Sequence, residues 1–356
     1  MSSRGRRIAI LAEGCFSPRD AKTAVGMLRY RPGEVVAVID STRAGRTTAE
    51  CAGVGGATPV VPGLQAAAAL GADTLMIGIA PQGGDLPAPW RAWVLDALER
   101  GWSVLSGLHA FLGDDPELAA AAGRSGAVIH DVRRPRPGRP VGSRRAREID
   151  ARVVLTVGTD CNVGKMTAAL ELEQELIRRG ARARFVATGQ TGIFIAGRGV
   201  PADAVVSDFL AGAVEQEVLE AAGGADVLIV EGQGSLHHPG YSAVTLGILH
   251  GACPSDLILC HWAGRAGMTV AGAREALPLP TLEESARAAE TASEWGAPAR
   301  VIGLALNTLD LDEKTALEAC REGSARLGVP ATDPVRFGAA VLAEAVTRSR
   351  SRPAEH

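Results

Sequence analysis

Residues 158–167, with the sequence GTDCNVGKMT, constrain the fold of this chain more than any other segment. Before them, residues 152–156 form an apolar, β-branched run that predicts a buried strand. After them, residues 166–180 carry apolar side chains at helical spacing and end on a glycine. A strand, a glycine-bounded loop, a lysine and a helix together make the pattern of a phosphate-binding P-loop. In such a loop the backbone N–H groups and the helix N-terminus converge on one anionic group.

Lysine usage singles out Lys165 within this loop. The chain has 37 lysines and arginines, but lysine occurs only at positions 22, 165 and 314. A lysine kept where arginine has taken nearly every other basic position favours a role that needs a compact charge in a tight loop. The alternative is an ordinary strand-to-helix turn, and the retained lysine argues against it.

The loop departs from the common P-loop pattern in two ways. Gly158 precedes Lys165 by seven residues rather than six, and Met166 stands where a serine or threonine normally binds Mg²⁺. A hydroxyl follows one position later, at Thr167. The spacing and the GTD opening resemble the dethiobiotin synthetase branch of P-loop proteins. The missing hydroxyl argues against Mg-ATP chemistry.

The first part of the chain reads as a second α/β unit. Up to residue 132, short apolar runs alternate with helical stretches, which predicts a parallel sheet covered by helices in a Rossmann-like order. The dinucleotide fingerprint GxGxxG is absent, because EGCFSP follows the first strand. Asp40 ends the second expected strand, where an acid would bind a ribose. A helix cap or a solvated strand end is the favoured interpretation of Asp40.

Composition excludes several classes of function. The net charge of −3 gives no general attraction to nucleic acid or to a membrane surface. No apolar run is long enough to span a bilayer, and the run IAILA near the N-terminus is too short for a signal peptide. The six cysteines form no CxxC pair, so we expect reduced thiols in a cytoplasmic protein.

An arginine- and proline-rich stretch separates the two parts. Residues 133–150 lack an apolar period and are interpreted as a solvated linker, with a basic arm for nucleic acid or ligand phosphates as the alternative. The chain is therefore predicted to be an α/β protein with largely parallel sheets. It is expected to combine a Rossmann-like domain over residues 1–132 with a P-loop NTPase-like domain over residues 151–350.

Within the second domain, polar residues recur where expected strands end. Because the carboxyl ends of parallel strands meet at one edge of a sheet, these residues predict the position of a site. They are Asp160, Gln190, Glu231, His261 and Asn307.

Two further segments bear on this site. Gln190 lies in TGQTG, which is expected to form a polar turn, and residues 207–222 are expected to form a helix with Ser207 as its cap. Glu231 follows the buried run VLIV, where a carboxylate suits a metal or a water molecule. His237 and His238 come next, in a loop expected to hang over the same site.

Taken together, these motifs resemble a bacterial family classified as a domain of unknown function. Its members pair an N-terminal Rossmann-like domain with a C-terminal P-loop domain, and the resemblance covers nearly the whole chain. The motifs that carry the resemblance are GTDCNVGKMT, VATGQTG, IVEGQGSLHHPGYS, GLALNT and TDPVR.

The resemblance implies an N-acetyltransferase that acts on D-glutamate with acetyl-CoA as donor. CoA carries a pyrophosphate and a 3′-phosphate, so a P-loop can bind it without hydrolysing anything. The dethiobiotin-synthetase-like fold of the second domain implies ATP and Mg²⁺ instead. An ATP-dependent ligase or kinase therefore stays open, as does a nucleotide-sensing regulator whose P-loop only binds.

The N-acetyltransferase hypothesis assigns roles to named residues and predicts that no metal ion is bound. The partners are a small amino-acid substrate and further copies of the chain in a homo-oligomer. Expected catalytic residues are Asp160, Lys165, Glu231 and His237. Residues expected to bind the donor are Gly158, Thr159, Cys161, Asn162, Val163, Gly164, Lys165, Met166, Thr167, Gln190 and Asn307.

Overall fold

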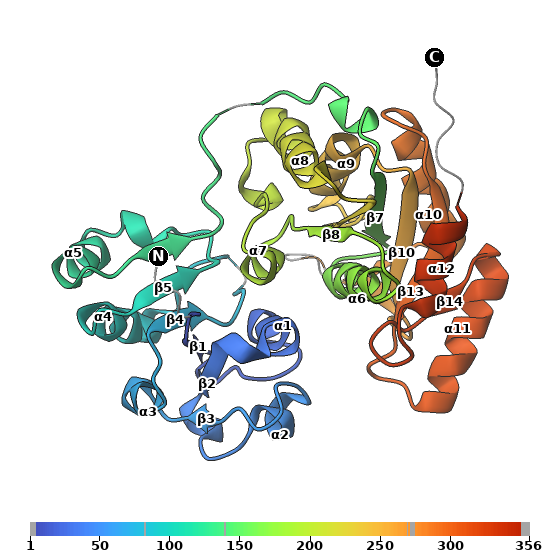
Figure 1. Cartoon of the computed structure of the whole chain (residues 1–356). Coiled ribbons are helices and arrows are strands. Elements are labelled where there is room, and N and C mark those ends of the chain that lie inside the picture. Colours follow the sequence, from blue (N-terminus) through green and yellow to red (C-terminus); the bar gives the residue numbers. More distant parts are fainter. Residues whose placement is uncertain (1–4, 82, 139, 269, 271–274, 350–356) are drawn as a thin grey trace. The chain divides into compact units, whose positions relative to one another are not determined.

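The computed structural model describes residues 5–349, except residues 82, 139, 269 and 271–274. The chain divides into two compact units, residues 1–135 with 193–197, and residues 136–192 with 198–356. Within the described residues, each unit contains a six-stranded sheet whose strands all run parallel (Figure 1). The predicted α/β class with two largely parallel sheets is confirmed.

The first unit has the strand order β3-β2-β1-β4-β5-β6. The chain reverses direction across the sheet at β1, as the Rossmann-like prediction requires. The strands are β1 Ile8–Leu11, β2 Val35–Ile39, β3 Val60–Val61, β4 Thr74–Ile77, β5 Ser103–Ser106 and β6 Ile129–Asp131. The helices are α1 Lys22–Tyr30, α2 Thr48–Ala52, α3 Leu64–Ala69, α4 Arg91–Glu99 and α5 Pro116–Ser125.

Asp40, directly after β2, is a structural residue. Its Oδ2 accepts a hydrogen bond from Phe16 N at 3.1 Å, and its Oδ1 accepts from the backbone N and the Oγ1 of Thr42. The carboxylate is fully buried. Both oxygens are therefore committed to joining the loop after β1 to the turn after β2, which confirms the cap interpretation.

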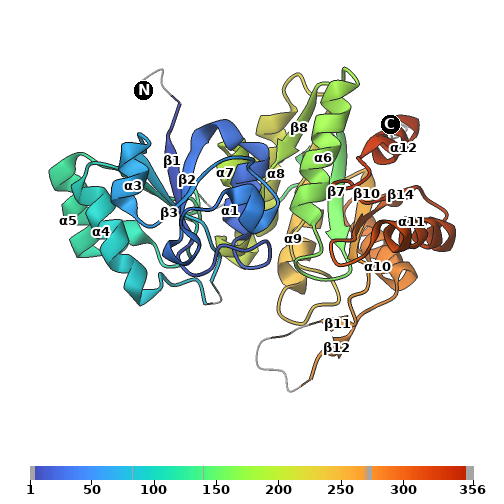
Figure 2. The same ribbon diagram turned by 90° about the horizontal axis from the view of Figure 1, so that it is seen from below.

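The second unit has the strand order β14-β13-β10-β7-β9-β8, with β7 at the point where the chain reverses. A short antiparallel pair, β11 and β12, stands apart from this sheet (Figure 2). The strands are β7 Arg152–Gly158, β8 Ala183–Val186, β9 Val227–Val230, β10 Asp256–Trp262, β11 Gly267–Met268, β12 Leu277–Pro278, β13 Arg300–Asn307 and β14 Ala331–Thr332. The helices are α6 Lys165–Arg178, α8 Ser207–Ala222, α9 Ser242–Ala252, α10 Leu282–Glu294, α11 Glu313–Leu327 and α12 Ala340–Arg348. Helix α7, Gln190–Ala196, begins in this unit, and its residues from 193 on belong to the first.

Helices cover both faces of this sheet, so its strands are buried on both sides. Alternate residues of β7, Val153, Leu155 and Val157, face a core built with α8, α9, α10 and α11. Helices α6 and α12 pack against each other and against the sheet. Such burial explains why these strands read as continuous apolar runs in the sequence.

Two local predictions in this unit were wrong. The segment TGQTG is not a simple turn, because α7 begins at Gln190. A Cβ on Gly192 would lie 2.3 Å from Glu231 Oε2, so the missing side chain lets α7 approach that carboxylate. Ser207 is the first residue of α8 rather than its cap, and Val206 occupies the cap position without a side-chain hydrogen bond.

The arginine-rich stretch packs against the second unit over much of its length. Glu215 of α8 accepts hydrogen bonds from Ser143 N, Ser143 Oγ and Arg145 N. Ala146 is buried, and Arg136 forms ion pairs with Glu217 and Glu220. Carboxylates of α8 therefore neutralise part of the positive charge that the linker interpretation left solvated.

None of the helices in the described part of the chain is long and apolar enough to cross a bilayer.

Candidate functional site

The loop between β7 and α6 has the tight backbone course expected of a phosphate-binding loop. Asn162 and Gly164 adopt positive φ values of 59° and 104°, in the left-handed region that glycine and asparagine tolerate best. At Gly158, a Cβ would lie 2.9 Å from Val163 Cγ2 and 3.0 Å from Lys165 Nζ. A larger residue there would crowd Val163 and Lys165, whose side chain folds back across the start of its own loop.

Lys165 opens α6 and points into the interior of the loop. Its Nζ donates a hydrogen bond to the carbonyl oxygen of Asp160 at 2.8 Å, and only 6% of the residue is exposed. Burial lowers the pKa of the ammonium, while nearby Cys161, Asp160 and Glu231 act in the opposite direction. The side chain is thus a buried amine in a glycine-bounded loop.

Asp160 and Arg265 fix the outer side of the loop. Asp160 Oδ1 accepts from Cys161 N at 2.6 Å, and Asp160 Oδ2 is buried without a hydrogen bond. Arg265 Nη1 lies 3.2 Å from that Oδ2 as an ion pair and also donates to the carbonyl of Cys161 at 2.8 Å. Sequence reasoning missed Arg265, whose only signal is its glycine-flanked position, AGRAG, shortly after β10.

Glu231 follows β9 and lies beside the lysine. Its Oε2 accepts hydrogen bonds from the backbone N–H groups of Thr188 and Gly189, both at 3.0 Å. Burial raises the pKa of this carboxyl, and those two hydrogen bonds and the charge of Lys165 oppose the rise. One carboxylate oxygen is therefore committed to shaping the loop after β8.

The remaining strand-end residues gather at the same edge of the sheet. Thr159 Oγ1 and His261 Nδ1 are 2.9 Å apart, which joins the end of β7 to that of β10. Asn307 Oδ1 accepts from Leu309 N at 3.1 Å, and Gln190 is buried at the start of α7. The predicted gathering of polar residues at the carboxyl edge is therefore present.

Met166 and Thr167 occupy the first turn of α6, and both are half-buried. A thioether is a soft ligand that suits Mg²⁺ poorly, since Mg²⁺ prefers oxygen. Val163 of the same loop is buried. The position that usually supplies a metal-binding hydroxyl therefore offers none.

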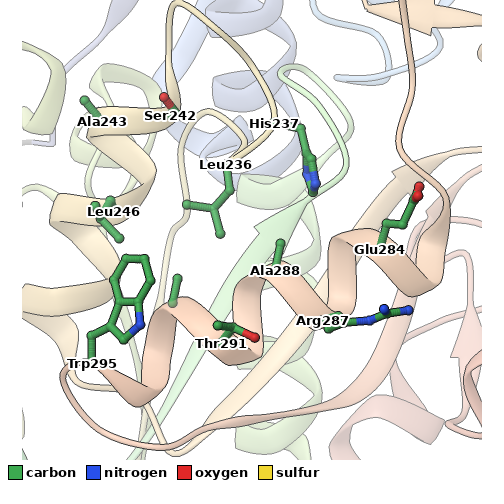
Figure 3. A pocket seen from close by; sticks show the side chains of 11 residues that line it. Leu236, His237, Ser242, Ala243, Leu246, Glu284, Arg287, Ala288, Thr291 and Trp295 are labelled. Atoms are coloured by element: carbon green, nitrogen blue, oxygen red, sulfur yellow. The ribbon is translucent and has the colours of Figure 1, made fainter.

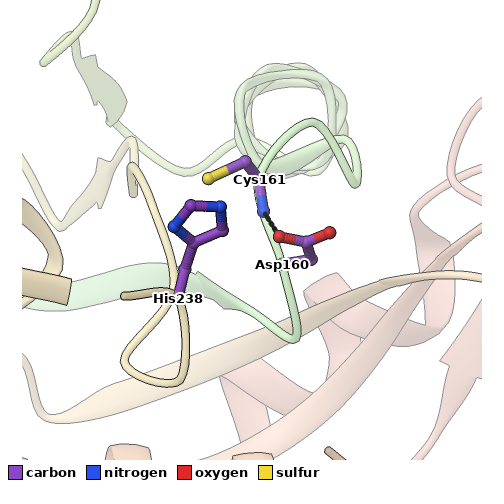
Figure 4. A group of neighbouring side chains, drawn as sticks. All are labelled: Asp160, Cys161 and His238. Atoms are coloured by element: carbon purple, nitrogen blue, oxygen red, sulfur yellow. Dashed lines mark hydrogen bonds between the residues drawn. The ribbon is translucent and has the colours of Figure 1, made fainter. Parts of the chain in front are cut away.

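The two adjacent histidines face different surroundings. His237 is exposed and borders a cavity together with residues of α10 (Figure 3). His238 is buried, and its ring nitrogen lies within 4.8 Å of Cys161 Sγ and of a carboxylate oxygen of Asp160 (Figure 4). The loop after β9 thus contributes one histidine to the P-loop and the other to the cavity.

His238 accepts a hydrogen bond from the turn that follows it. Gly240 N–H donates to His238 Nδ1 at 3.1 Å, which leaves Nε2 as the ring nitrogen without that contact. The ring groups with the Cys161 thiol and the Asp160 carboxylate of the P-loop.

The TDPVR motif has a structural role. Asp333 Oδ2 accepts from the backbone N and the Oγ1 of Thr308, at 3.0 and 2.6 Å. Its Oδ1 accepts from the N–H groups of Val335 and Arg336. The motif therefore fixes the loop after β13 near the site without reaching into it.

Comparison with known proteins agrees with this architecture. A domain of unknown function described as the DUF1611 P-loop domain matches residues 140–343, and the DUF1611 Rossmann-like domain matches residues 41–135. A crystal structure of a DUF1611 family protein from Anabaena variabilis is 42% identical, with a TM-score of 0.91 over 97% of this chain and 100% of that one.

Two curated relatives have a named activity. A protein of Tritonibacter scottomollicae named D-glutamate N-acetyltransferase is 40% identical over 331 residues, which are 92% of this chain and 94% of that protein. A protein of Pseudoalteromonas sp. with the same name is 37% identical over 275 residues, which are 76% of this chain and 80% of that protein. Because both domains match over residues 41–135 and 140–343, the chain belongs to the DUF1611 family.

Proposed function

We propose that this protein is an N-acetyltransferase that moves an acetyl group from acetyl-CoA to the amine of an acidic amino acid, with D-glutamate as the leading substrate. Two relatives that bear the name D-glutamate N-acetyltransferase support the reaction class, since one of them matches 92% of this chain. The geometry of the P-loop supports the choice of donor.

The observation that carries the proposal is a phosphate loop without its usual metal ligand. Lys165 is buried in a loop of the right shape, while Met166 replaces the hydroxyl that would bind Mg²⁺. CoA has phosphates to occupy such a loop and needs no metal-assisted phosphoryl transfer. Arg265, which pairs with Asp160, adds a second basic side chain beside the loop.

Roles for the predicted catalytic residues follow from their contacts. Lys165 binds the donor phosphates, and Asp160 positions that lysine through its carbonyl oxygen. Glu231 balances the buried ammonium and shapes the loop after β8. His237 is the exposed histidine of the loop after β9 and serves as the base that accepts a proton from the attacking amine.

Isothermal titration and a thiol-release assay test this function. Acetyl-CoA and CoA are expected to bind with equal affinity, because the acetyl group lies far from the phosphates. Adding D-glutamate should then release free thiol in the presence of EDTA and without ATP. Lys165→Ala should lower donor affinity roughly 10- to 150-fold, the effect of about 1.5–3 kcal/mol for a hydrogen bond to a charged group.

Lys314 of α11 provides the matched control, since it is exposed. Lys314→Ala should bind acetyl-CoA as the wild type does. Normal donor affinity in folded Lys165→Ala would refute the P-loop assignment.

Tight Mg-ATP binding, with ADP released only when an amino acid or carboxylate is added, would replace the transferase with an ATP-dependent ligase in which Thr167 supplies the metal ligand. Nucleotide binding without turnover would indicate a sensor.

A further inference from the structure

A cavity of about 740 Å³ lies in the second unit between the loop after β9, the start of α9 and one face of α10. Its size is in the range that encloses a drug-sized ligand and exceeds the needs of one amino acid. His237, assigned above as the base, is on its wall, and the adjacent His238 belongs to the P-loop group. The loop after β9 therefore lines the cavity with one histidine and reaches the P-loop with the next.

The two ends of the cavity differ in chemistry. His237, Glu284 and Arg287 gather at one end, and Leu246 and Trp295 lie at the other (Figure 3). Glu284 and Arg287 lie on α10 and Trp295 is its C-cap residue, and their spacings of three and eight residues place them on one helix face. The lining thus combines one cation, one anion and one imidazole with an apolar wall.

Arg287 is the feature that points to a ligand. Among the residues that the structure describes, no carboxylate is within ion-pair distance of its guanidinium, although Glu284 lies one turn away on the same helix. Glu284 is engaged in the capping box of α10, where its Oε2 accepts from Thr281 N at 2.8 Å and from Thr281 Oγ1 at 3.0 Å. Those hydrogen bonds hold the Glu284 carboxylate in its charged form beside His237.

We propose that this cavity is the acceptor site and binds the zwitterion of an amino acid between Arg287 and Glu284. The α-carboxylate pairs with the fork of Arg287, and the α-ammonium pairs with Glu284 next to His237. The apolar wall formed by Leu236, Leu246 and Trp295 suits the uncharged arm that carries the acetyl thioester. This inference rests on the proposed function and names its acceptor site.

Acetyl transfer in this site uses the amine of the substrate, the acetyl thioester, His237 and solvent. The ammonium loses one proton to solvent through His237, and the amine lone pair forms an N–C bond with the thioester carbonyl. The C–S bond breaks as the tetrahedral intermediate collapses, and the electron pair leaves on the CoA sulfur. The second proton of the amine passes through His237 to that thiolate, giving the N-acetyl amino acid and CoA.

Binding of D-glutamate and of its α-amide, measured by isothermal titration with and without CoA, tests the site. The wild type should bind D-glutamate more tightly than the α-amide, because only D-glutamate has an α-carboxylate to pair with Arg287. Arg287→Gln should lower D-glutamate affinity roughly 10- to 150-fold, remove the preference over the α-amide, and leave acetyl-CoA affinity unchanged. Arg287→Lys should retain part of the preference.

Arg321→Gln is the control, because Arg321 is an exposed arginine of α11 outside the cavity. Equal binding of D-glutamate to Arg287→Gln and wild type, or no binding to either, would overturn the acceptor site. Failure of the transferase itself gives a different pattern, in which D-glutamate binds through Arg287 but no thiol is released. Thiol release with an unchanged KM for D-glutamate in Arg287→Gln would refute the site and keep the function.

Discussion

At the scale of single residues, burial at the sheet edge sets protonation states that the sequence does not show. His261 ends β10, and its ring contacts Thr159 of the P-loop. Burial lowers the pKa of His261 to about 4, and the charges of Arg326 and Arg265 add to the effect. The imidazole is therefore neutral at neutral pH and is a poor candidate for acid–base catalysis at that pH.

This shift predicts a specific dependence of stability on pH. The unfolded imidazole has a pKa of 6.5, so the unfolded chain binds the proton first as pH falls. The contribution of His261 to the free energy of unfolding is therefore fully present above pH 6.5. This contribution, at most about 3 kcal/mol, is lost as pH falls towards about 4. Denaturant unfolding of His261→Gln between pH 7 and pH 4 should show a shallower loss of stability than the wild type. The exposed His237→Gln should keep the wild-type profile, and an unchanged profile in His261→Gln would contradict the assignment.

At the scale of elements, the approach of β9 to β7 depends on one glycine. Gly232 N donates to Thr156 Oγ1 at 2.9 Å, and a Cβ on Gly232 would lie 1.7 Å from the carbonyl oxygen of Thr156. The same Cβ would lie 3.3 Å from Lys165 Cδ. The glycine after Glu231 therefore lets the carboxylate-bearing loop close onto the P-loop.

We expect Gly232→Ala to lower the free energy of unfolding by about 3 kcal/mol or more, because backbone must move to admit the methyl group. Chemical denaturation measures this loss, and donor affinity should fall with it as the P-loop shifts. Gly223 is the comparison, since a Cβ there meets nothing within 4 Å. Gly223→Ala should stay within about 0.5 kcal/mol of wild type. Equal free energies of unfolding for the two variants would show that the backbone near Thr156 moves to admit the methyl group without cost.

At the scale of the whole molecule, two units with separate sheets and cores share one chain. The P-loop and the cavity are built from residues of the second unit alone. Units of this kind can unfold independently, and a ligand stabilises only the unit that binds it. If the second unit binds acetyl-CoA as proposed, the ligand should raise the free energy of unfolding of that unit only.

Acetyl-CoA at a hundred times its Kd should stabilise the second unit by about 2.7 kcal/mol and leave the first unchanged. The tryptophans separate the two signals, because 90, 93 and 102 belong to the first unit and 262 and 295 to the second. In Trp262→Phe/Trp295→Phe, fluorescence should report a transition that acetyl-CoA does not move. Far-UV circular dichroism should show a second transition that it does move. A single transition shifted by acetyl-CoA would show that the chain unfolds as one unit.

Contiguous sequence patterns predicted the local architecture of the donor loop and its place in the fold. A strand, a glycine, a lysine and a helix in succession define the loop, and Lys165 is buried in it because these features are contiguous in the chain. Polar residues such as Glu231 and Asn307 were predicted to share one edge, because strands that read as continuous apolar runs form parallel sheets. Alternating strands and helices likewise predicted both sheets.

Features that join distant segments of the chain depend on tertiary packing, which the sequence patterns do not report. Arg265 reaches Asp160 across 105 positions of sequence, and the cavity unites the loop after β9 with α10. The ring of His238 is oriented by a hydrogen bond from Gly240 N–H. Helix α7 begins where a turn was expected, because Gly192 packs against a carboxylate that lies far along the chain. Sequence patterns report local conformation and burial, whereas ion pairs, tautomers and cavities depend on which surfaces meet after folding.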